Sequence, residues 1–362
     1  MKKVKVLVGM SGGVDSSVSA YLLKEQGYDV VGVTMNLWTP DNPNNVQSDR
    51  SCCSIEAFND ARAVCTQLGI PYYVLNFQEI FKKHVVDNFI SEYLKGRTPN
   101  PCVLCNTIIK WDELLKKADE LGCKYLATGH YGKIRFNKET ELYELRRGDD
   151  PKKDQSYFLY GMTQRSLSRT LFPLSQISKD KVREIAKNMD LKTAEKKESM
   201  EICFIPDDNY NRFLKDNVED IGKIIKPGTM QVKNGGKLIR KHNGYPFYTI
   251  GQRKGLGGGF TEPMYVSNIN PDNNIIEISA RDGVFRSELI IENMNWIGNE
   301  STAKIKCTAK IRFNSVDTTC IAYPLENNKV KVIFNKPVFA VTPGQSAVLY
   351  DGDIVLGGGL IV

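Results

Sequence analysis

The sequence contains no apolar run that approaches the roughly 20 residues of a membrane-spanning helix, and its mean hydropathy is −0.33. The first apolar stretch, Val6 to Met10, gives way at once to Ser11, Gly12 and Gly13. It is therefore shorter than the apolar region of about 7–15 residues in a secretory signal. Internal repeats, low-complexity tracts and blocks of like charge are also missing. These absences predict a soluble cytoplasmic protein with no membrane partner.

Cysteine is sparse, with nine residues in 362. An odd, thinly spread set differs from the dense, even sets of small secreted scaffolds, so we expect thiols in a reducing compartment. The hydrophobic content of 41% and charged content of 25% are those of a globular protein. Lys and Arg number 49 against 42 Asp and Glu, a net charge of +7 that is compatible with a polyanionic partner.

The length of 362 residues predicts two or three domains. Near the N-terminus, apolar runs typical of strands alternate with amphipathic stretches typical of helices, which predicts a doubly wound parallel α/β sheet. The expected strands are 4–9, 29–35, 72–75 and 125–128, and the expected helices are 15–26, 55–68, around 84–95 and about 108–121.

The pattern changes after about Asp207, where Gly, Pro and Asn become frequent. Short β-like runs follow at 275–279, 303–313, 329–334 and 347–350, which favours a small β-barrel at the C-terminus. We therefore expect a doubly wound α/β domain over 1–205, a small central domain over 206–275 and a β-barrel over 276–362.

A glycine-rich loop lies between the first expected strand and the first expected helix, where backbone N–H groups and the helix dipole favour an anion. It runs Gly9, Met10, Ser11, Gly12, Gly13, Val14, Asp15, Ser16. No Lys precedes the Ser, so this is not a Walker A loop. It matches SGGxDS, the pyrophosphate loop of ATP enzymes that transfer AMP. Asp15 is a candidate ligand for Mg²⁺ beside the pyrophosphate.

Three cysteine sites are candidates for chemistry. Cys102 and Cys105 form a CxxC in a two-proline loop, and Cys105 is expected at or just before a helix N-terminus, where the dipole lowers a thiol pKa. Cys203 lies in the segment EICFIP, and Cys52 and Cys53 are adjacent in a polar loop. Cys65, Cys123, Cys307 and Cys320 follow apolar patterns and are expected to be core thiols.

A bound metal or iron–sulfur cluster is the alternative role for the CxxC, because four thiolates suit either. The second cysteine pair is adjacent, and neighbouring cysteines rarely ligate one ion together. A nucleophilic role therefore remains the leading interpretation, and no protein-bound metal cluster is expected.

With the pyrophosphate loop, NPCVLCN and EICFIP in this order, the chain resembles the bacterial tRNA-specific 2-thiouridylases over its whole length. The likeness continues through five further segments: 128–131 (TGHY), 153–159 (KDQSYFL), 248–257 (YTIGQRKGLG), and the barrel segments 310–313 (KIRF) and 340–345 (AVTPGQ). The resemblance implies an adenine nucleotide alpha hydrolase-like fold.

The resemblance also implies a reaction. ATP with Mg²⁺ adenylates O2 of the wobble uridine, position 34 of tRNA, and sulfur from a cysteine persulfide then replaces it, leaving 2-thiouridine, AMP and pyrophosphate. The activation is needed because the uridine oxygen is a poor leaving group. By motif, Cys203 resembles the persulfide carrier and Cys105 its partner, and a disulfide between them would need reduction. The implied partners are tRNA of the Lys, Glu and Gln isoacceptors and a cysteine desulfurase or sulfur-relay protein.

Other roles follow from the same resemblance. The ATP site would comprise Gly9 to Ser16, Met35 and Gly129. The target base and tRNA would be contacted by Asn100, Pro101, Cys102, His130, Lys153, Asp154, Gln155, Arg312, Phe313 and Gln345. An Arg beside an aromatic residue also suits phosphate pairing and base stacking.

The chain departs from the family pattern at two places. Cys102 stands where family members have Asp, which leaves open whether Cys102 substitutes for an acid or base. Met200 and Glu201 replace a small, glycine-containing approach to Cys203.

Three other functions fit parts of the pattern. They are a cluster-dependent tRNA thiolase, an AMP-forming amide ligase, and a non-catalytic RNA-binding protein, the last disfavoured by the intact loop.

Overall fold

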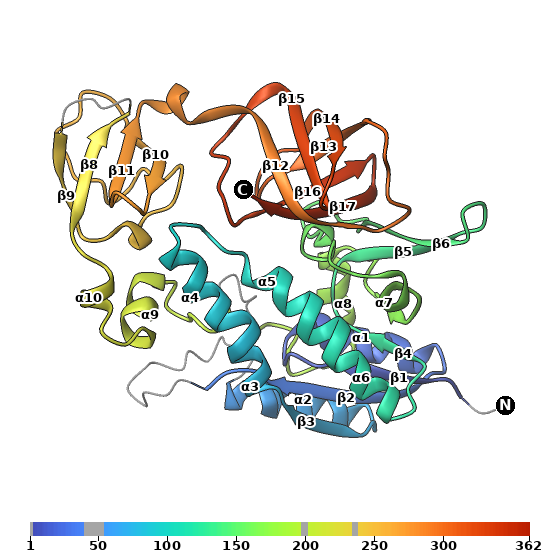
Figure 1. Cartoon of the computed structure of the whole chain (residues 1–362). Coiled ribbons are helices and arrows are strands. Elements are labelled where there is room, and N and C mark those ends of the chain that lie inside the picture. Colours follow the sequence, from blue (N-terminus) through green and yellow to red (C-terminus); the bar gives the residue numbers. More distant parts are fainter. Residues whose placement is uncertain (1–2, 40–53, 197–201, 234–237) are drawn as a thin grey trace. The chain divides into compact units, whose positions relative to one another are not determined.

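The computed structural model describes residues 3–39, 54–196, 202–233 and 238–362. It divides into two compact units (Figure 1). The first comprises 1–86, 102–208 and 353–356, and the second comprises 87–101, 209–352 and 357–362. The chain thus passes between the units several times. The predicted domain boundaries at 205 and 275 stay a prediction.

The first unit is built on a five-stranded parallel sheet in the order β3-β2-β1-β4-β7. Its strands are β1 (Lys5–Gly9), β2 (Asp29–Asn36), β3 (Tyr72–Asn76), β4 (Tyr125–Ala127) and β7 (Thr170–Leu171). From β1 the chain adds β2 and β3 on one side and later β4 and β7 on the other, so the direction of strand order switches between β1 and β4. This confirms the predicted doubly wound sheet, and such a switch point is where α/β proteins bind ligands.

The central strand is buried on both faces. Val6, Leu7 and Val8 are each 0% exposed, as expected for a parallel strand covered by helices on either side. Val6 and Val8 pack in one cluster with residues of α1 (Val14–Glu25), α2 (Ile55–Gln67) and α8 (Lys179–Asn188). This packing fixes the carboxyl end of β1, from which the glycine-rich loop emerges.

Shorter helical segments complete the part of the chain up to residue 168. They are α3 (Gln78–Phe81), the π-helix η1 (Lys82–Val86), α4 (Asp87–Leu94), α5 (Pro101–Leu104), the π-helix η2 (Cys105–Leu114), α6 (Leu115–Glu120), the 3₁₀ turn η3 (Ser156–Phe158) and α7 (Gln164–Ser168). No helix within the described ranges combines the length and apolarity that crossing a bilayer requires.

Two helices begin earlier than the sequence pattern predicts. The helix expected from about residue 84 starts at Gln78, whose N–H donates to Asn76 Oδ1 at 3.0 Å. The helix expected from Ile108 starts at Pro101. Proline suits the first helical position because its missing N–H would have no intrahelical partner there. The expectation of a two-proline loop is therefore wrong for Pro101, whereas Pro99 lies in the loop before the helix.

The first unit also contains a hairpin that the sequence pattern did not predict. It consists of β5 (Gly132–Asn137) and β6 (Leu142–Arg147), in which charged residues interrupt the apolar alternation. Arg146 of β6 pairs with Ile354 at the start of β17 (Ile354–Ile361), which is why residues 353–356 belong to this unit.

The second unit contains a four-stranded sheet in the order β10-β11-β8-β9. Its strands are β8 (Gly228–Val232), β9 (Leu238–His242), β10 (Tyr265–Asn270) and β11 (Ile275–Ser279). Met230, Leu256, Val266, Ile276 and Ile278 form its buried core. The helical segments around it are α9 (Tyr210–Asn217), α10 (Ile221–Ile224), η4 (Tyr245–Phe247) and η5 (Arg281–Val284).

A closed six-stranded antiparallel barrel ends the chain and confirms the predicted β-barrel. Its order is β12-β15-β14-β13-β16-β17, and β17 pairs back onto β12. The strands besides β17 are β12 (Phe285–Trp296), β13 (Ile305–Lys310), β14 (Thr318–Leu325), β15 (Lys329–Phe339) and β16 (Ser346–Asp351).

The strand expected over 303–313 ends at Lys310. Ser315 Oγ accepts the N–H groups of Ile311 and Arg312, both at 3.1 Å, and so folds the following residues into a turn. Arg312 and Phe313 therefore lie in a turn and not in a strand.

Leu126 provides a test of the sheet. It is 0% exposed in β4, so Leu126→Ala should lower the free energy of unfolding by about 2–5 kcal/mol. Leu121→Ala is the matched control, because Leu121 is 38% exposed and its truncation should cost less than about 1 kcal/mol. Urea unfolding would measure both, and equal losses would contradict the assignment of β4 to the core.

Candidate functional site

The glycine-rich loop closes on itself at the switch point of the sheet. Ser16 Oγ accepts the Ser11 N–H at 3.1 Å and donates to the Gly13 carbonyl at 3.0 Å. Gly12 has φ +70°, and a Cβ there would lie 2.3 Å from the Ala57 carbonyl oxygen. Glycine is therefore required at this position, both for the left-handed backbone and for the close approach of α2.

The N-terminus of α1 is available to an anion. Gly13 is its N-cap and provides no side-chain cap for the first N–H groups of the helix. Uncapped N–H groups and the positive end of the helix dipole together favour phosphate. Ser11 is exposed beside this helix end.

The neighbouring strands bring the other predicted ATP-site residues to the same edge of the sheet. Met35 is the penultimate residue of β2. Gly129 follows β4 and lies against the first turn of α1, because a Cβ on Gly129 would come within 2.9 Å of Asp15 C and Ser16 N. Gly129 and the loop are thus in contact, as their joint assignment requires.

Asp15 is held by two side chains that the sequence analysis did not single out. Lys179 Nζ donates to both Asp15 carboxylate oxygens at 2.7 Å, and the Tyr131 hydroxyl donates to Oδ1 at 2.7 Å. The Lys179 side chain is only 8% exposed and that of Asp15 31%. A charge buried to this degree needs a partner, so this pair fixes the start of α8 to the start of α1.

The KDQ segment (residues 153–155) and the residues just before it bond the groups that hold Asp15. Gln155 and Tyr131 are joined by two hydrogen bonds. The Tyr131 N–H donates to the side-chain Oε1 of Gln155 at 3.1 Å, and the Gln155 N–H donates to the Tyr131 carbonyl at 2.8 Å. Lys179 N–H donates to Asp150 Oδ2 at 3.0 Å. Gln155 therefore helps to position Tyr131, and Asp150 helps to position Lys179.

Asp154 has an internal role in the same segment. It is 6% exposed, and its oxygens accept from Gly148 N–H, Ser156 N–H and Ser156 Oγ–H at 2.9–3.1 Å. Half-buried Lys153 precedes it. The structure thus places Asp154 and Gln155 in the support of the loop, and their predicted contact with tRNA stays a prediction.

His130 links the site to the cysteine-bearing helix. Lys110 Nζ lies 3.2 Å from His130 Nε2 and donates to Asn106 Oδ1 at 2.8 Å, while His130 Nδ1 lies 2.7 Å from Thr128 Oγ1. Burial and, secondarily, the Lys110 charge hold the pKa of His130 well below its usual value of 6.5. A neutral ring accepts from Lys110 at Nε2 and donates from Nδ1 to Thr128.

The environment of the CxxC differs from the prediction. Because α5 begins at Pro101, Cys105 is the fifth helical residue and lies beyond the first turn, where the dipole acts most strongly. Cys102 lies in that first turn and is exposed. The expectation that the helix N-terminus activates Cys105 is therefore wrong.

The π-helix η2 determines which residues share a helix face with Cys105. In a π-helix the hydrogen bonds run from i to i+5, so Cys105 and Lys110 lie on the same face of η2. Single π-bulges often occur at functional sites. Lys110 thus connects the face of Cys105 to His130, a relation that CxxC spacing alone did not indicate.

Cys203 is anchored by its neighbours. Phe204 and Ile205 are 3% and 1% exposed, and the Phe204 ring packs edge-on against Phe81 at 5.7 Å. Cys203 itself is partly exposed. The approach to it, including Met200 and Glu201, lies outside the described residues.

The segment before that approach is tied to α2 by an ion-pair cluster. Asp60 is 3% exposed and bonds Lys196 Nζ at 2.5 Å and Lys192 Nζ at 2.9 Å. Burial alone would raise the pKa of Asp60, but the two lysines lower it overall. The cluster fixes the start of the chain segment that leads to Cys203.

In the second unit, Gln345 holds the segment that leads into α5. Its Nε2 donates to the Thr98 and Pro99 carbonyls at 3.1 and 3.0 Å, and Thr98 N–H donates to the Pro343 carbonyl at 2.9 Å. Gln345 thus bonds the two residues that directly precede Asn100 and Pro101 in the chain.

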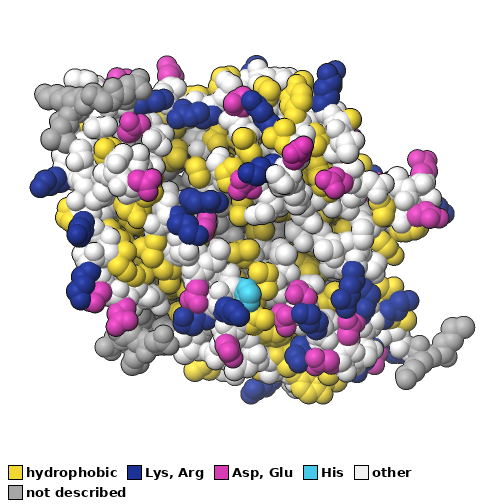
Figure 2. Space-filling view, viewed as in Figure 1, with side chains coloured by type: hydrophobic (Ala, Val, Ile, Leu, Met, Phe, Trp, Pro, Cys, Tyr) yellow, Lys and Arg dark blue, Asp and Glu magenta, His cyan; other side chains and the backbone are white. Residues whose placement is uncertain are grey.

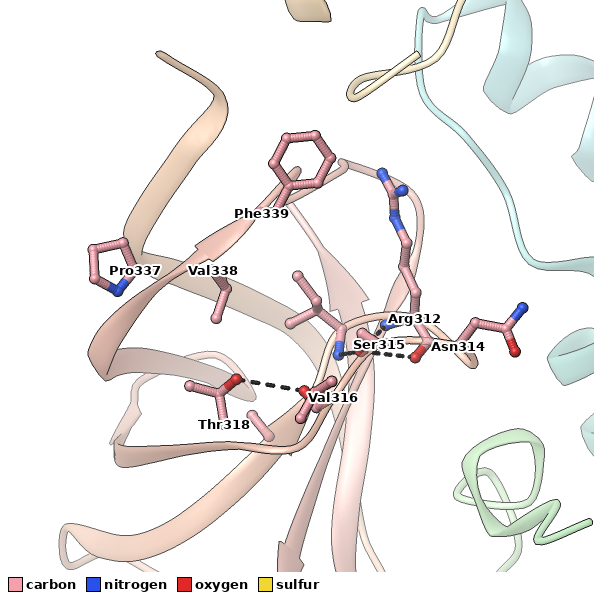
Figure 3. Close-up of a pocket in the computed structure, with 10 residues that line it drawn as sticks. Arg312, Asn314, Ser315, Val316, Thr318, Pro337, Val338 and Phe339 are labelled. Atoms are coloured by element: carbon pink, nitrogen blue, oxygen red, sulfur yellow. Dashed lines mark hydrogen bonds between the residues drawn. The ribbon is translucent and has the colours of Figure 1, made fainter. Parts of the chain in front are cut away.

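Arg312 joins three segments of the second unit. Its guanidinium donates to the Ile250 and Ala340 carbonyls at 2.9 and 3.0 Å and to Thr342 Oγ1. It lines a barrel pocket of about 420 Å³ together with Ala309, Ile311, Asn314, Ser315, Val316, Thr318, Pro337, Val338 and Phe339 (Figure 3). Arg312 therefore organises this end of the barrel, and its predicted contact with tRNA stays a prediction.

The surface adds no single basic stripe on the face seen in Figure 2. Lys and Arg side chains are scattered there among acidic ones, in line with a net charge of +7.

Within the described ranges, no three or more His, Cys, Asp or Glu side chains lie together in a way that could hold a metal ion. The cluster alternative also involves Cys52 and Cys53, which lie outside the described residues.

Three family models match consecutive parts of the chain. A tRNA methyl transferase HUP domain matches residues 4–207, a tRNA methyl transferase PRC-barrel domain matches 211–280, and an aminomethyltransferase beta-barrel domain matches 286–361.

Curated relatives match almost the full length. A protein of Carboxydothermus hydrogenoformans named tRNA-specific 2-thiouridylase MnmA is 50% identical over 358 residues, covering 99% of this chain and 97% of its own. The MnmA 1 protein of Thermoanaerobacter sp. (strain X514) is 48% identical over 361 residues, covering 99% and 98%. The MnmA protein of Clostridioides difficile (strain 630) is 48% identical over 358 residues, with the same coverage.

The state of His130 can be tested by NMR titration of its ring C–H signal. Because burial and Lys110 lower its pKa, the signal should keep its neutral position while the pH falls through 6.5. The unfolded chain binds a proton at that pH and the folded chain does not, so His130 makes the protein less stable as the pH falls.

Lys110→Met is the matched variant for this titration. Removing the Lys110 charge should raise the titration midpoint of His130, though burial keeps it below the ordinary value. A wild-type midpoint near 6.5 would contradict the neutral ring.

Proposed function

We propose that this chain, which belongs to the family of tRNA-specific 2-thiouridylases, uses ATP to adenylate O2 of the wobble uridine 34 of tRNA and then delivers persulfide sulfur to C2. The products are 2-thiouridine, AMP and pyrophosphate. The observation that carries this proposal is the self-closed loop Ser11 to Ser16 at an uncapped helix N-terminus. It is a phosphate site at the switch point of a parallel sheet, and the two cysteines required for sulfur transfer lie in the same unit.

ATP binding is assigned to Gly9 through Ser16, Met35 and Gly129. Backbone N–H groups at the start of α1 would take the phosphates, because nothing in the loop caps them. Gly129 lets the end of β4 approach this turn closely. The bound phosphates would thus be held by backbone dipoles, which are already oriented before ATP arrives.

Asp15 is suited to be the one protein carboxylate that binds Mg²⁺. The bonds from Lys179 and Tyr131 occupy three of its roughly four lone-pair sites. Mg²⁺ in nucleotide sites usually takes one or two carboxylates and draws its other ligands from phosphate and water. When bound, Mg²⁺ would neutralise phosphate charge. Lys179 holds the carboxylate in place and offsets its charge next to the phosphate loop.

The sulfur step is assigned to Cys203 and Cys105. The terminal sulfur of a Cys203 persulfide would attack C2 and displace AMP, leaving the base joined to Cys203 through an S–S bond. The Cys105 thiolate would then attack the Cys203 sulfur, break that bond and release 2-thiouridine. The resulting Cys105–Cys203 disulfide takes two electrons and two protons from a reductant before the next turnover.

The tRNA substrate would be contacted by several segments. Asn100, Pro101 and Cys102 are proposed to meet the target base, and Gln345 fixes the path of the chain just before them. His130, Lys153, Asp154, Gln155, Arg312 and Phe313 are proposed to act on the tRNA side. Four of these residues also form the internal bonds described above, so part of their role would be to support the loops that contact tRNA. They are His130, Asp154, Gln155 and Arg312.

The wider setting is part of the same proposal. Residues 1–205 would carry ATP binding and catalysis, 206–275 a small central domain, and 276–362 the barrel that meets tRNA. The substrates would be the Lys, Glu and Gln isoacceptors, and a cysteine desulfurase or sulfur-relay protein would supply the sulfur in the cytoplasm.

Cys105→Ser and Cys203→Ser test the sulfur step. Each should lower wobble 2-thiouridine, measured by mass spectrometry of digested tRNA, by more than about 100-fold, because no other group replaces a reacting thiol. tRNA-dependent exchange of pyrophosphate into ATP should persist in both variants. Cys123→Ala removes another thiol of the first unit and should retain activity. Full thiolation by either Ser variant would refute the mechanism.

Lys179→Met tests the ion pair at the loop. It leaves the Asp15 carboxylate without its cation beside the phosphates, so the Kd for ATP should rise roughly 10- to 100-fold, since like charges in close contact cost several kcal/mol. Lys181→Met, two residues along α8, is the matched control. Lys181 is 55% exposed and pairs with Glu184 in solvent. Equal ATP affinities for both variants, measured by calorimetry, would contradict the assigned role.

A further inference from the structure

Two cysteines of the barrel, which the sequence analysis assigned to the core, lie directly opposite each other. Cys307 in β13 is the register partner of Cys320 in β14, and their Sγ atoms are 3.6 Å apart. Directly opposed residues of antiparallel strands have side chains on the same face and Cα atoms about 4.5–5.5 Å apart. This spacing falls within the range of about 4.4–6.8 Å that disulfides span.

The two thiols differ in access. Cys307 is partly exposed, whereas Cys320 is 3% exposed. Either sulfur could donate the hydrogen bond between them. With Cys320 as donor, this bond lowers the pKa of Cys307 and raises the pKa of Cys320. The Cys307 sulfur is thus the more accessible of the two, and the Cys320 sulfur is buried 3.6 Å from it.

A neighbouring residue pair of the β13–β14 hairpin connects the two cysteines to the pocket of Figure 3. Ala309 pairs with Thr318, and this pair lies two residues along the strands from Cys307 and Cys320, on the same face. Ala309 and Thr318 both line that pocket. The cysteine pair therefore lies beside the barrel pocket and not in a sealed core. It takes no part in the sulfur step assigned to Cys105 and Cys203.

We propose that Cys307 and Cys320 form a thiol–disulfide exchange site that reacts with low-molecular-weight disulfides. The Cys307 thiolate attacks the small disulfide RSSR, breaks its S–S bond and releases one thiol. Cys320 then gives up its proton and attacks the mixed disulfide, which expels the second thiol. Overall, RSSR is reduced to two RSH while the protein dithiol is oxidised to one disulfide, and excess thiol reverses the reaction.

Oxidised glutathione is the probe for this site, applied to the folded full-length chain followed by alkylation and non-reducing tryptic mapping. Trypsin cuts after Lys306, Lys310, Arg312 and Lys329, so the two cysteines fall in separate peptides, 307–310 and 313–329. We expect these peptides to be joined and to separate on reduction. Cys65 is the internal control, because it is 0% exposed and burial raises its pKa to about 12, so it should stay reduced.

Two variants test the order of attack. Cys320→Ser should trap glutathione on Cys307, because the resolving thiol is gone. Cys307→Ser should take up glutathione at Cys320 at least roughly tenfold more slowly, because Cys320 is buried.

The proposal is overturned if both thiols of the wild type are alkylated after incubation. It is equally overturned if glutathione stays on Cys307 without a 307–320 link, or if the link forms only in denaturant. None of these readouts depends on thiolation of tRNA.

Discussion

The ion pair between Lys179 and Asp15 is the interaction on which the rest of the first unit depends. A lysine with 8% of its side chain exposed requires a compensating charge, and Asp15 supplies it from the first turn of α1. Two loops converge on the pair, one through Tyr131 and one through Asp150. The geometry of the phosphate loop is thereby tied to the strand β4, the KDQ segment and the helix α8.

A second set of polar bonds performs the same task in the second unit. Arg312 holds Ile250, Ala340 and Thr342 together, and Gln345 holds Thr98 and Pro99. In both units, the family resemblance assigns certain side chains to tRNA binding, and these side chains form hydrogen bonds with groups of the protein itself. A residue of this kind acts on a substrate partly by fixing the loop that meets it, so its substitution affects loop position as well as contact.

Much of the fold could be predicted from local patterns. The strand–loop–helix at Val6 to Glu25 and the change to short β-runs after residue 270 are periodicity signals that tertiary context left unchanged. The helix start at Pro101 was missed because proline fits both a loop and a first helical turn. That shift moved Cys105 beyond the first turn of the helix, into the π-helix η2 that also contains Lys110.

By itself, the sequence determined the class of the sheet, the phosphate loop, the two cysteines assigned to sulfur transfer and the likeness to a tRNA-thiolating family. These features depend on residues close together in the chain or on motifs in a fixed order. The tertiary structure decided which distant groups meet: Lys179 with Asp15 across 164 positions, Lys110 with His130, and Cys307 with Cys320. Such pairs follow from strand register and helix packing, which bring residues together by burying apolar surface and leave no trace in local spacing.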